Sequence, residues 1–286
     1  MSRFAEIRSG RRRSSATRPP WLSRLYWFLE RRIDPGTESS QNVYARVVKA
    51  HVNRGSRWLD LGCGHDIFPE WITGQQELAE RPQLLVGLDY SVESLRQHKT
   101  IRKLLAGDVD RLPFVSGTFD LITANMVFEH LANPAASLTE IRRALKPGGR
   151  LIFHTTNFWF FQIYAASLMP DRIKRLLARI SEGRAESDVF PTLYRINTAK
   201  TIERVVADAG FEVEQFQKLN TSSTGDMLLY GPFVMLPLVW RRLLRFPRLQ
   251  NYRSNFIVVL RTPEHQYNGR DLTVAEYVSQ PRAQTT

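Results

Sequence analysis

The chain has 286 residues, of which 43% are hydrophobic and 24% are charged. This is enough to bury a full core and suits one large domain with insertions better than several small ones. The single cysteine, Cys63, excludes a disulfide within the chain and a cysteine cluster for a metal, and it indicates a reducing compartment. The formal net charge of +12 permits an anionic partner such as nucleic acid.

The amino-terminal region is predicted to be a basic arm followed by helices. Residues 1–20 hold six arginines and one acidic residue, which indicates a disordered arm, with an organelle transit peptide as the alternative. Arg24 interrupts the apolar stretch that a secretory signal would need. Residues 21–50 are expected to be helical: an amphipathic helix packs on the domain or covers its site, and a second helix around 42–51 leads into the first strand.

The next segment predicts a strand that ends in a ligand-binding turn. A short apolar strand from Arg57 runs into Asp60 and two glycines, Gly62 and Gly64. A Cβ at either glycine would block a positive φ or the close approach of a nucleoside-sized ligand, although plain tight turns also use this pattern. A second strand, 84–89, ends in Asp89 about 25 residues later, where a carboxylate can reach ribose hydroxyls.

Two further strands are predicted to bring polar residues to the same edge. A third strand is expected to end near Asp108, before a proline-containing turn, and a fourth covers 119–125. Asn133 is the predicted N-cap of the next helix, with Pro134 at its first position and a stop at Lys146-Pro147. A strand over 150–154, a helix over 202–209 and a strand from 211 complete an α/β alternation typical of a doubly wound sheet.

Two insertions, 158–194 and 221–253, are predicted to be helical caps. They are expected to determine which substrate the protein accepts. The first is aromatic and continues into a basic amphipathic helix around 173–180. The second has an apolar run of about 14 residues, too short for the roughly 20 residues of a membrane span. Both can pack over an acceptor pocket, and both can lie in a membrane interface. Residues 51–263 form the main domain with these insertions, and 264–286 a tail.

Five motifs in order, LDLGCG, GLDYS, GDVDRLPF, FDLITANMVFEHL and LKPGGRLIF, resemble the class I S-adenosylmethionine (SAM)-dependent methyltransferases, particularly the ubiquinone and menaquinone biosynthesis branch. The resemblance covers roughly 58–156 and continues more weakly through 197–219 and 255–261. It implies a Rossmann-like seven-stranded sheet with helices on both faces and an antiparallel last strand. The implied cofactor is SAM, and no metal is implied.

The resemblance also assigns the cofactor residues. Gly62, Cys63 and Gly64 would pass under SAM, with Asp60 near its amino-acid end. Asp89 would hold the ribose hydroxyls, with Tyr90 beside it in the same motif. The adenine would meet Asp108 and Val109, and the sulfonium would be bordered by Asn125 and Met126. Asp66 departs from the family pattern, because many methyltransferases carry a glycine there.

His130 is the leading candidate for a catalytic base, because it follows the fourth strand and histidine is the residue type most often used as a general base; a packed helix-start histidine is the alternative. Other candidates are Glu129, His154 and Tyr194. The expected acceptor is a small molecule, a lipid or a lipid-linked glycan, since similar insertions occur in methyltransferase relatives that serve bacterial envelope polysaccharides.

The sequence leaves three alternatives to that function. RNA is a less favoured acceptor, because the basic residues concentrate in the arm and beside apolar insertions. A membrane-associated module without turnover stays open, and a nicotinamide enzyme is disfavoured by the missing pyrophosphate turn. A cytoplasmic location is expected, with peripheral contact at the inner face of the membrane as an option, and the sequence leaves the oligomeric state open.

Overall fold

The computed structural model describes residues 20–35, 38–168, 191–220 and 235–264. Its centre is a seven-stranded sheet with the strand order β3-β2-β1-β4-β5-β7-β6. The strands are β1 (Arg57–Leu61), β2 (Leu84–Asp89), β3 (Lys103–Ala106), β4 (Phe119–Asn125), β5 (Leu145–Thr156), β6 (Glu212–Leu219) and β7 (Asn255–Arg261). β1 to β5 pair in parallel with their neighbours, whereas β7 runs antiparallel to both β5 and β6. The predicted fold, including the antiparallel last strand, is confirmed.

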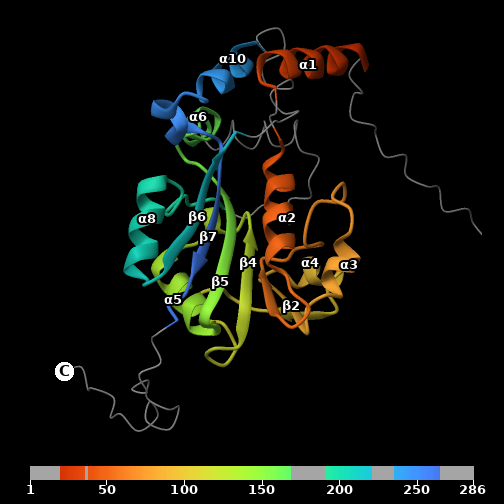
Figure 1. Cartoon of the computed structure of the whole chain (residues 1–286), viewed down its shortest axis with the longest axis vertical. Coiled ribbons are helices and arrows are strands. Elements are labelled where there is room, and N and C mark those ends of the chain that lie inside the picture. Colours follow the sequence, from red (N-terminus) through yellow and green to blue (C-terminus); the bar gives the residue numbers. More distant parts are fainter. Residues whose placement is uncertain (1–19, 36–37, 169–190, 221–234, 265–286) are drawn as a thin grey trace, which may run out of the picture.

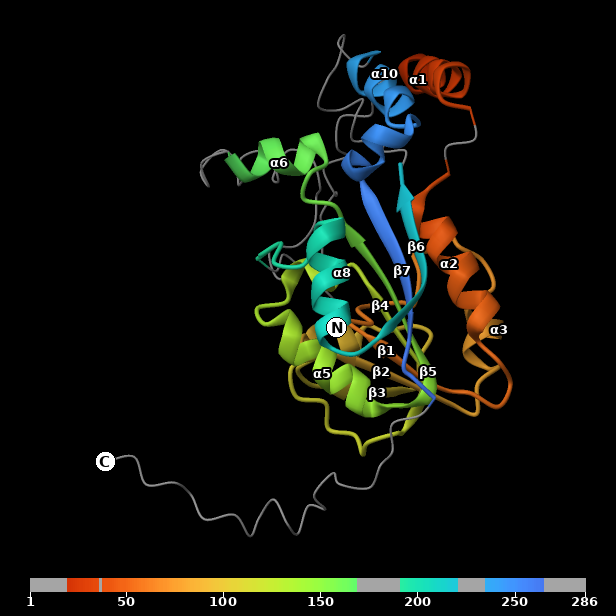
Figure 2. The same cartoon turned by 60° about the vertical axis from the view of Figure 1, so that its left-hand side comes forward.

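Helices cover both faces of this sheet. The helices of the main domain are α2 (Ser40–His51), α3 (Gln75–Ala79), α4 (Val92–Arg96), α5 (Pro134–Ala144) and α8 (Ala199–Asp208). Figure 2 shows α2 and α3 on one side of the sheet and α5 and α8 on the other. Each side has its own buried apolar cluster, one around Leu138 and Ile202, the other around Tyr44 and Trp58. The central strands are therefore apolar on both faces, as parallel strands between helix layers must be.

The start of α5 follows the sequence prediction, whereas its end does not. The Asn133 side chain accepts a hydrogen bond from the Ala136 N–H at 3.3 Å, and Pro134 occupies the first turn. The helix ends at Ala144, and β5 begins at once with Leu145 instead of at the predicted residue 150. A register shift opposite Phe119 accommodates this early start, since an irregular pairing tolerates the proline and glycines of the segment.

The third strand also ends earlier than predicted. β3 stops at Ala106, and Asp108 lies in the following turn, where its Oδ1 accepts a hydrogen bond from the Asp110 N–H at 3.0 Å. The Gly107 N–H donates to the Asp89 carbonyl at 3.0 Å, which holds the turn beside the end of β2. Asp108 thus stays at the carboxyl edge of the sheet although it is not part of a strand.

Within the described ranges, three helices form a cap at one end of the molecule. These are α1 (Pro20–Ile33), α6 (Phe161–Leu168) and α10 (Met235–Leu243). Because α6 follows β5 and α10 precedes the antiparallel β7, the cap lies beyond the carboxyl ends of the parallel strands, as Figures 1 and 2 show. Two ion pairs connect α1 and the residue after it to the α10 region: Glu30 with Arg241 at 2.8 Å, and Asp34 with Arg245 at 2.6 Å.

Parts of the sequence predictions fall outside the described residues. These are the basic arm up to residue 19, the predicted helix at 173–180, residues 221–234 of the second insertion and the tail from residue 265. Pro20, assigned above to the arm, is the first residue of α1.

Candidate active site

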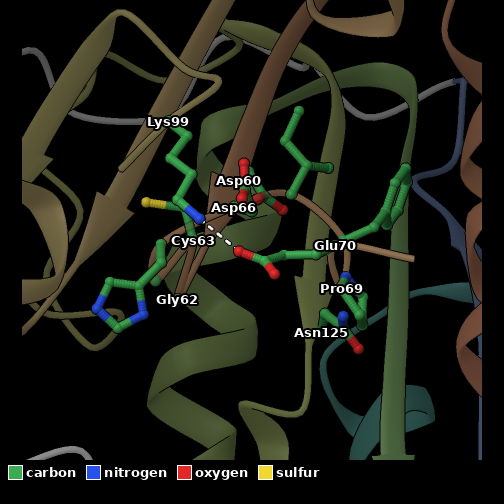
Figure 3. Close-up of a pocket in the computed structure, with 12 residues that line it drawn as sticks. Asp60, Gly62, Cys63, Asp66, Pro69, Glu70, Lys99 and Asn125 are labelled. Carbon is green, nitrogen blue, oxygen red and sulfur yellow. Dashed lines mark hydrogen bonds and ion pairs between the residues drawn. The ribbon is translucent and has the colours of Figure 1, made fainter. Parts of the chain in front are cut away.

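Two neighbouring cavities surround the turn after β1. The smaller has a volume of about 360 Å³ and the larger about 1010 Å³, and they share Gly62, Gly64, His65 and Asn125 in their walls. Figure 3 shows the smaller cavity, where Lys99 and Glu70 reach toward each other as an ion pair of 2.5 Å. Every cofactor residue named from the sequence lines one cavity or both: Asp60, Gly62, Cys63, Gly64, Asp89, Tyr90, Asp108, Val109, Asn125 and Met126. The fold therefore brings the scattered motifs to one edge.

The two glycines of the turn are required for different reasons. Gly62 has φ of 62° and Gly64 has φ of 52°, a region that side chains disfavour. A Cβ at Gly62 would lie 2.4 Å from Cγ2 of Val127, so this glycine makes room for the segment after β4. A Cβ at Gly64 would meet nothing within 4 Å. Gly64 therefore faces open space through which a ligand can approach the backbone.

This difference predicts two separable defects. Gly62→Ala is expected to destabilise the fold by about 3 kcal/mol, because it adds a steric clash to the strain of a positive φ. Gly64→Ala should cost only the strain, about 1 kcal/mol, while it intrudes on the ligand space. Chemical denaturation gives both values. Adding Val127→Ala to Gly62→Ala should restore part of the lost stability, because it removes the clash. Adding it to Gly64→Ala should restore none. Equal rescue of both variants would contradict this explanation.

Asp89 ties the turn to the end of β2. Its Oδ2 accepts a hydrogen bond from the Gly64 N–H at 2.8 Å, and its Oδ1 accepts one from the Ser91 N–H at 2.8 Å. Each carboxylate oxygen can accept a second hydrogen bond, and the residue lines the larger cavity. The neighbouring Tyr90 is 75% exposed at the rim of that cavity. The carboxylate is therefore fixed in place and can take a ligand hydroxyl.

Asp60 is a buried acid that a cationic ligand would stabilise. It is 3% exposed, and its Oδ1 accepts a hydrogen bond from the Thr123 hydroxyl at 2.6 Å. Thr123 in turn accepts one from the Trp58 indole at 2.7 Å. The pKa of Asp60 is raised from 3.8 to about 7, chiefly by burial; the Thr123 hydrogen bond opposes this rise and the nearby charge of Asp89 adds to it. A positive group in the smaller cavity would favour the ionised form and bind more tightly for that reason.

Asn125 is oriented by a residue that the sequence analysis missed. Its amide nitrogen donates to Oε1 of Gln41 at 2.9 Å, and its Oδ1 contacts His154 Nδ1 at 2.9 Å. Gln41 comes from α2 and lines the larger cavity. Tyr44, one turn further along α2, stacks on the His154 ring with 5.6 Å between centroids. No motif marks these residues, because only the packing of α2 on the sheet brings them to the site.

The candidate bases differ in their access to the larger cavity. His130, Glu129 and Tyr194 line it. His130 Nδ1 lies 3.0 Å from the Pro191 carbonyl. Glu129 is 3% exposed, accepts a hydrogen bond from the Thr155 hydroxyl at 2.8 Å, and has a pKa raised by burial. His154 is 1% exposed, and burial lowers its pKa to about 3, so it fits an orienting role better than that of a base.

The sulfur of Cys63 packs inside the turn. The residue is 2% exposed, and a Cβ added at Gly87 would lie 2.7 Å from its Sγ. Burial raises the pKa of the thiol, and the charges of Asp60 and Asp89 act in the same direction. The thiol therefore stays protonated and packs as a small apolar side chain against β2.

Comparison with known proteins identifies the class. A model of the methyltransferase domain matches residues 37–216, more than half of the chain, so the chain belongs to the methyltransferase-domain family. More particularly, it is a class I SAM-dependent methyltransferase with relatives in the menaquinone branch. A demethylmenaquinone methyltransferase from Corynebacterium kroppenstedtii is 32% identical over 166 residues, which cover 55% of this chain and 69% of the relative.

Two other likenesses extend this result. An uncharacterized methyltransferase from Schizosaccharomyces pombe is 29% identical over 142 residues, and the match covers 46% of this chain and 51% of the relative. The chain therefore spans about half the length of that relative. A putative methyltransferase solved with the Trm112 activator of Haloferax volcanii has a TM-score of 0.53 at 20% identity, covering 86% of this chain and 96% of the other. That likeness shows the fold alone.

The residues of the site fit SAM. The open space at Gly64 admits a ligand close to the backbone, and Asp60 and Asp89 supply negative charge for a cationic cofactor that carries no phosphate. When bound, SAM supplies an electrophilic methyl group, so the protein chiefly has to hold the acceptor in line and exclude water. Such positioning can lower a barrier by about 7–11 kcal/mol.

Proposed function

We propose that this protein transfers a methyl group from SAM to a small-molecule, lipid or lipid-linked glycan acceptor held in the larger cavity. The observation that supports this most is the extent of that cavity, about 1010 Å³, which continues from the cofactor residues to a second wall. The second wall is formed by Val127 and residues 129–132 after β4 together with Thr156, Thr192 and Tyr194. The volume is at the upper end of the range for small-molecule sites, about 300–1000 Å³, and suits a cofactor plus an acceptor.

Within this proposal the cofactor residues keep the roles assigned from the sequence. Asp89 accepts the ribose hydroxyls, while Asp108 and the Val109 backbone meet the adenine. Asp60 holds the turn near the amino-acid end, where its carboxylate can attract the ammonium group, and Asn125 and Met126 border the sulfonium. Cys63 contributes through its backbone, because its thiol is packed against β2. Gln41 joins the set as a positioning residue, since it fixes the Asn125 amide.

His130 is the proposed base for a hydroxyl acceptor. The Pro191 carbonyl can only accept a hydrogen bond, so Nδ1 of His130 carries the proton and Nε2 carries the basic lone pair. That tautomer suits a ring that takes a proton through Nε2. Glu129 is the alternative, because it lines the same cavity and burial raises its pKa, which makes its carboxylate a stronger base.

The names of two relatives support a lipid or small-molecule acceptor. The relative from Corynebacterium kroppenstedtii is named for a menaquinone precursor. Another from Coxiella burnetii, 30% identical over 131 residues and matched over 42% of its length, is named a malonyl-[acyl-carrier protein] O-methyltransferase. Neither name fixes the acceptor of this chain, so the test compares acceptor classes directly.

The experiment incubates the protein with methyl-labelled SAM and separate lipid, glycan and RNA fractions. We expect label in the lipid fraction or in the small molecules extracted with it, and none when Asp89→Ala protein is used. Label in RNA alone would support the RNA alternative and overturn the proposed acceptor class. SAM binding with no labelled fraction at all would favour the non-catalytic module.

A further inference from the structure

We propose that the outer faces of α1 and α10 form a docking surface for a bilayer that carries anionic lipids. This inference goes beyond the proposed methyl transfer and does not depend on the identity of the acceptor. The surface, called here the cap face, consists of exposed apolar and arginine side chains. Its apolar members are Leu25, Phe28, Val239, Leu243 and Phe246. Its arginines are Arg24, Arg31, Arg32, Arg242 and Arg248.

The apolar members follow the spacing of single helix faces. Leu25 and Phe28 are three residues apart on α1, and they are 44% and 55% exposed. Val239, Leu243 and Phe246 repeat at four and then three residues along α10 and the turn after it, with Phe246 60% exposed. Residues at these intervals lie on one side of a helix. Large apolar side chains that are grouped and exposed in this way mark an interaction surface more often than isolated ones do.

The charge of the cap face favours an anionic partner. Residues 20–35 and 235–254 contain only two acidic side chains, Glu30 and Asp34. Both are buried and form ion pairs with Arg241 and Arg245. The acids of the cap are therefore neutralised inside it, whereas the arginines of the cap face point outward. Apolar side chains bordered by arginines are the pattern of helices that lie in a membrane interface.

The position of the cap makes such docking compatible with access to the site. α1 and α10 lie side by side at the end of the molecule beyond the carboxyl ends of the parallel strands, and both views agree on this (Figures 1 and 2). The larger cavity opens at the same edge of the sheet. Among the described helices none is long and apolar enough to cross a membrane, so the contact would be with the surface of the bilayer.

Vesicle sedimentation tests the inference. The full chain is mixed with vesicles of phosphatidylcholine alone, or of equal parts phosphatidylcholine and phosphatidylglycerol, at low and high salt. We expect binding to the anionic vesicles, weakened by salt, and little binding to the neutral ones. Since each basic residue near an anionic surface contributes about a fivefold gain, exchanging Arg31, Arg32 and Arg242 for Gln should weaken binding about a hundredfold. Phe28→Ser with Phe246→Ser should weaken binding at least about tenfold.

Matched variants at the opposite edge of the sheet serve as controls. Val115 is 80% exposed shortly before β4, and Arg54 is exposed in the turn before β1. Val115→Ser and Arg54→Gln should leave vesicle binding unchanged. Calorimetric SAM binding monitors folding of every variant without any methyl transfer. Absence of vesicle binding, equal binding to neutral vesicles, or equal loss in the controls would overturn the inference. A dimer in solution that the two Phe substitutions dissociate would assign the cap face to a second copy instead.

Discussion

Asp89→Ala protein is expected to bind SAM at least about a hundredfold more weakly than the wild type, because two charge-assisted hydrogen bonds to the ribose would be lost. The effect should exceed that of a simple side-chain deletion, since Asp89 also holds the Gly64 N–H at 2.8 Å and so fixes the glycine turn. Calorimetric titration of the purified protein with SAM measures the change. Circular dichroism checks that the variant is folded.

The matched control for Asp89 is an acid at the other edge of the sheet. Asp120 lies at the start of β4, is 37% exposed and pairs with Lys146 at 2.7 Å. Asp120→Ala removes the same charge without touching either cavity, so its SAM affinity should stay within about twofold of the wild type. If both variants lost affinity equally, the loss would report charge or stability, and Asp89 would not be the ribose ligand.

Asp60→Asn is expected to make the SAM-free protein more stable at pH 8 while it weakens SAM binding. The pKa of Asp60 is about 7 in the fold and 3.8 when unperturbed, so between these values the folded protein keeps a proton that the unfolded chain releases. The free energy of unfolding therefore falls as the pH rises from about 4 to about 7 and then stays level. A shift of about three pKa units corresponds to about 4 kcal/mol, the largest gain that Asn can give at pH 8.

Denaturant unfolding of both proteins between pH 5 and pH 8 measures this gain. The advantage of Asp60→Asn should shrink toward pH 5, where the wild-type carboxyl is largely protonated. SAM affinity of the wild type should rise as the pH rises through about 7, because the ionised carboxylate attracts the cationic ligand, and the variant should lack this rise. A variant that is less stable at pH 8, with SAM affinity equal to that of the wild type, would contradict the role given to Asp60.

The sequence predicted most reliably the elements whose signals are local. β2 and β4 have the predicted bounds, because each is a mostly apolar run that ends in a polar residue. The Asn133 cap and the order of helices and strands also follow from neighbouring residues. The sequence analysis missed the early start of β5, because the segment Lys146-Pro147-Gly148-Gly149 predicts the end of a helix. Only the pairing with β4 shows that the same segment is also the beginning of a strand.

The site contains features that no local pattern could reveal. Gly62 was expected to permit a positive φ or the approach of a ligand. It has the positive φ, but a Cβ there would meet Val127, which follows the end of another strand. Gln41 reaches Asn125, 84 residues away in the chain, and Glu30 pairs with Arg241 across 211 residues. The burial of His154, which lowers its pKa, likewise depends on the packing of α2. Long-range packing, and not motif spacing, sets these contacts.

A crystal structure of the protein with S-adenosylhomocysteine, the product form of the cofactor, would test the central claim most directly. The claim is that Asp60, Asp89 and Asp108, which line the two cavities around Gly62 and Gly64, hold one cofactor between them. We predict the ribose hydroxyls within hydrogen-bond distance of Asp89, the adenine beside Asp108 and Val109, and the amino-acid end toward Asp60. A ligand bound away from these carboxylates, or with its ribose directed elsewhere, would contradict the assignment.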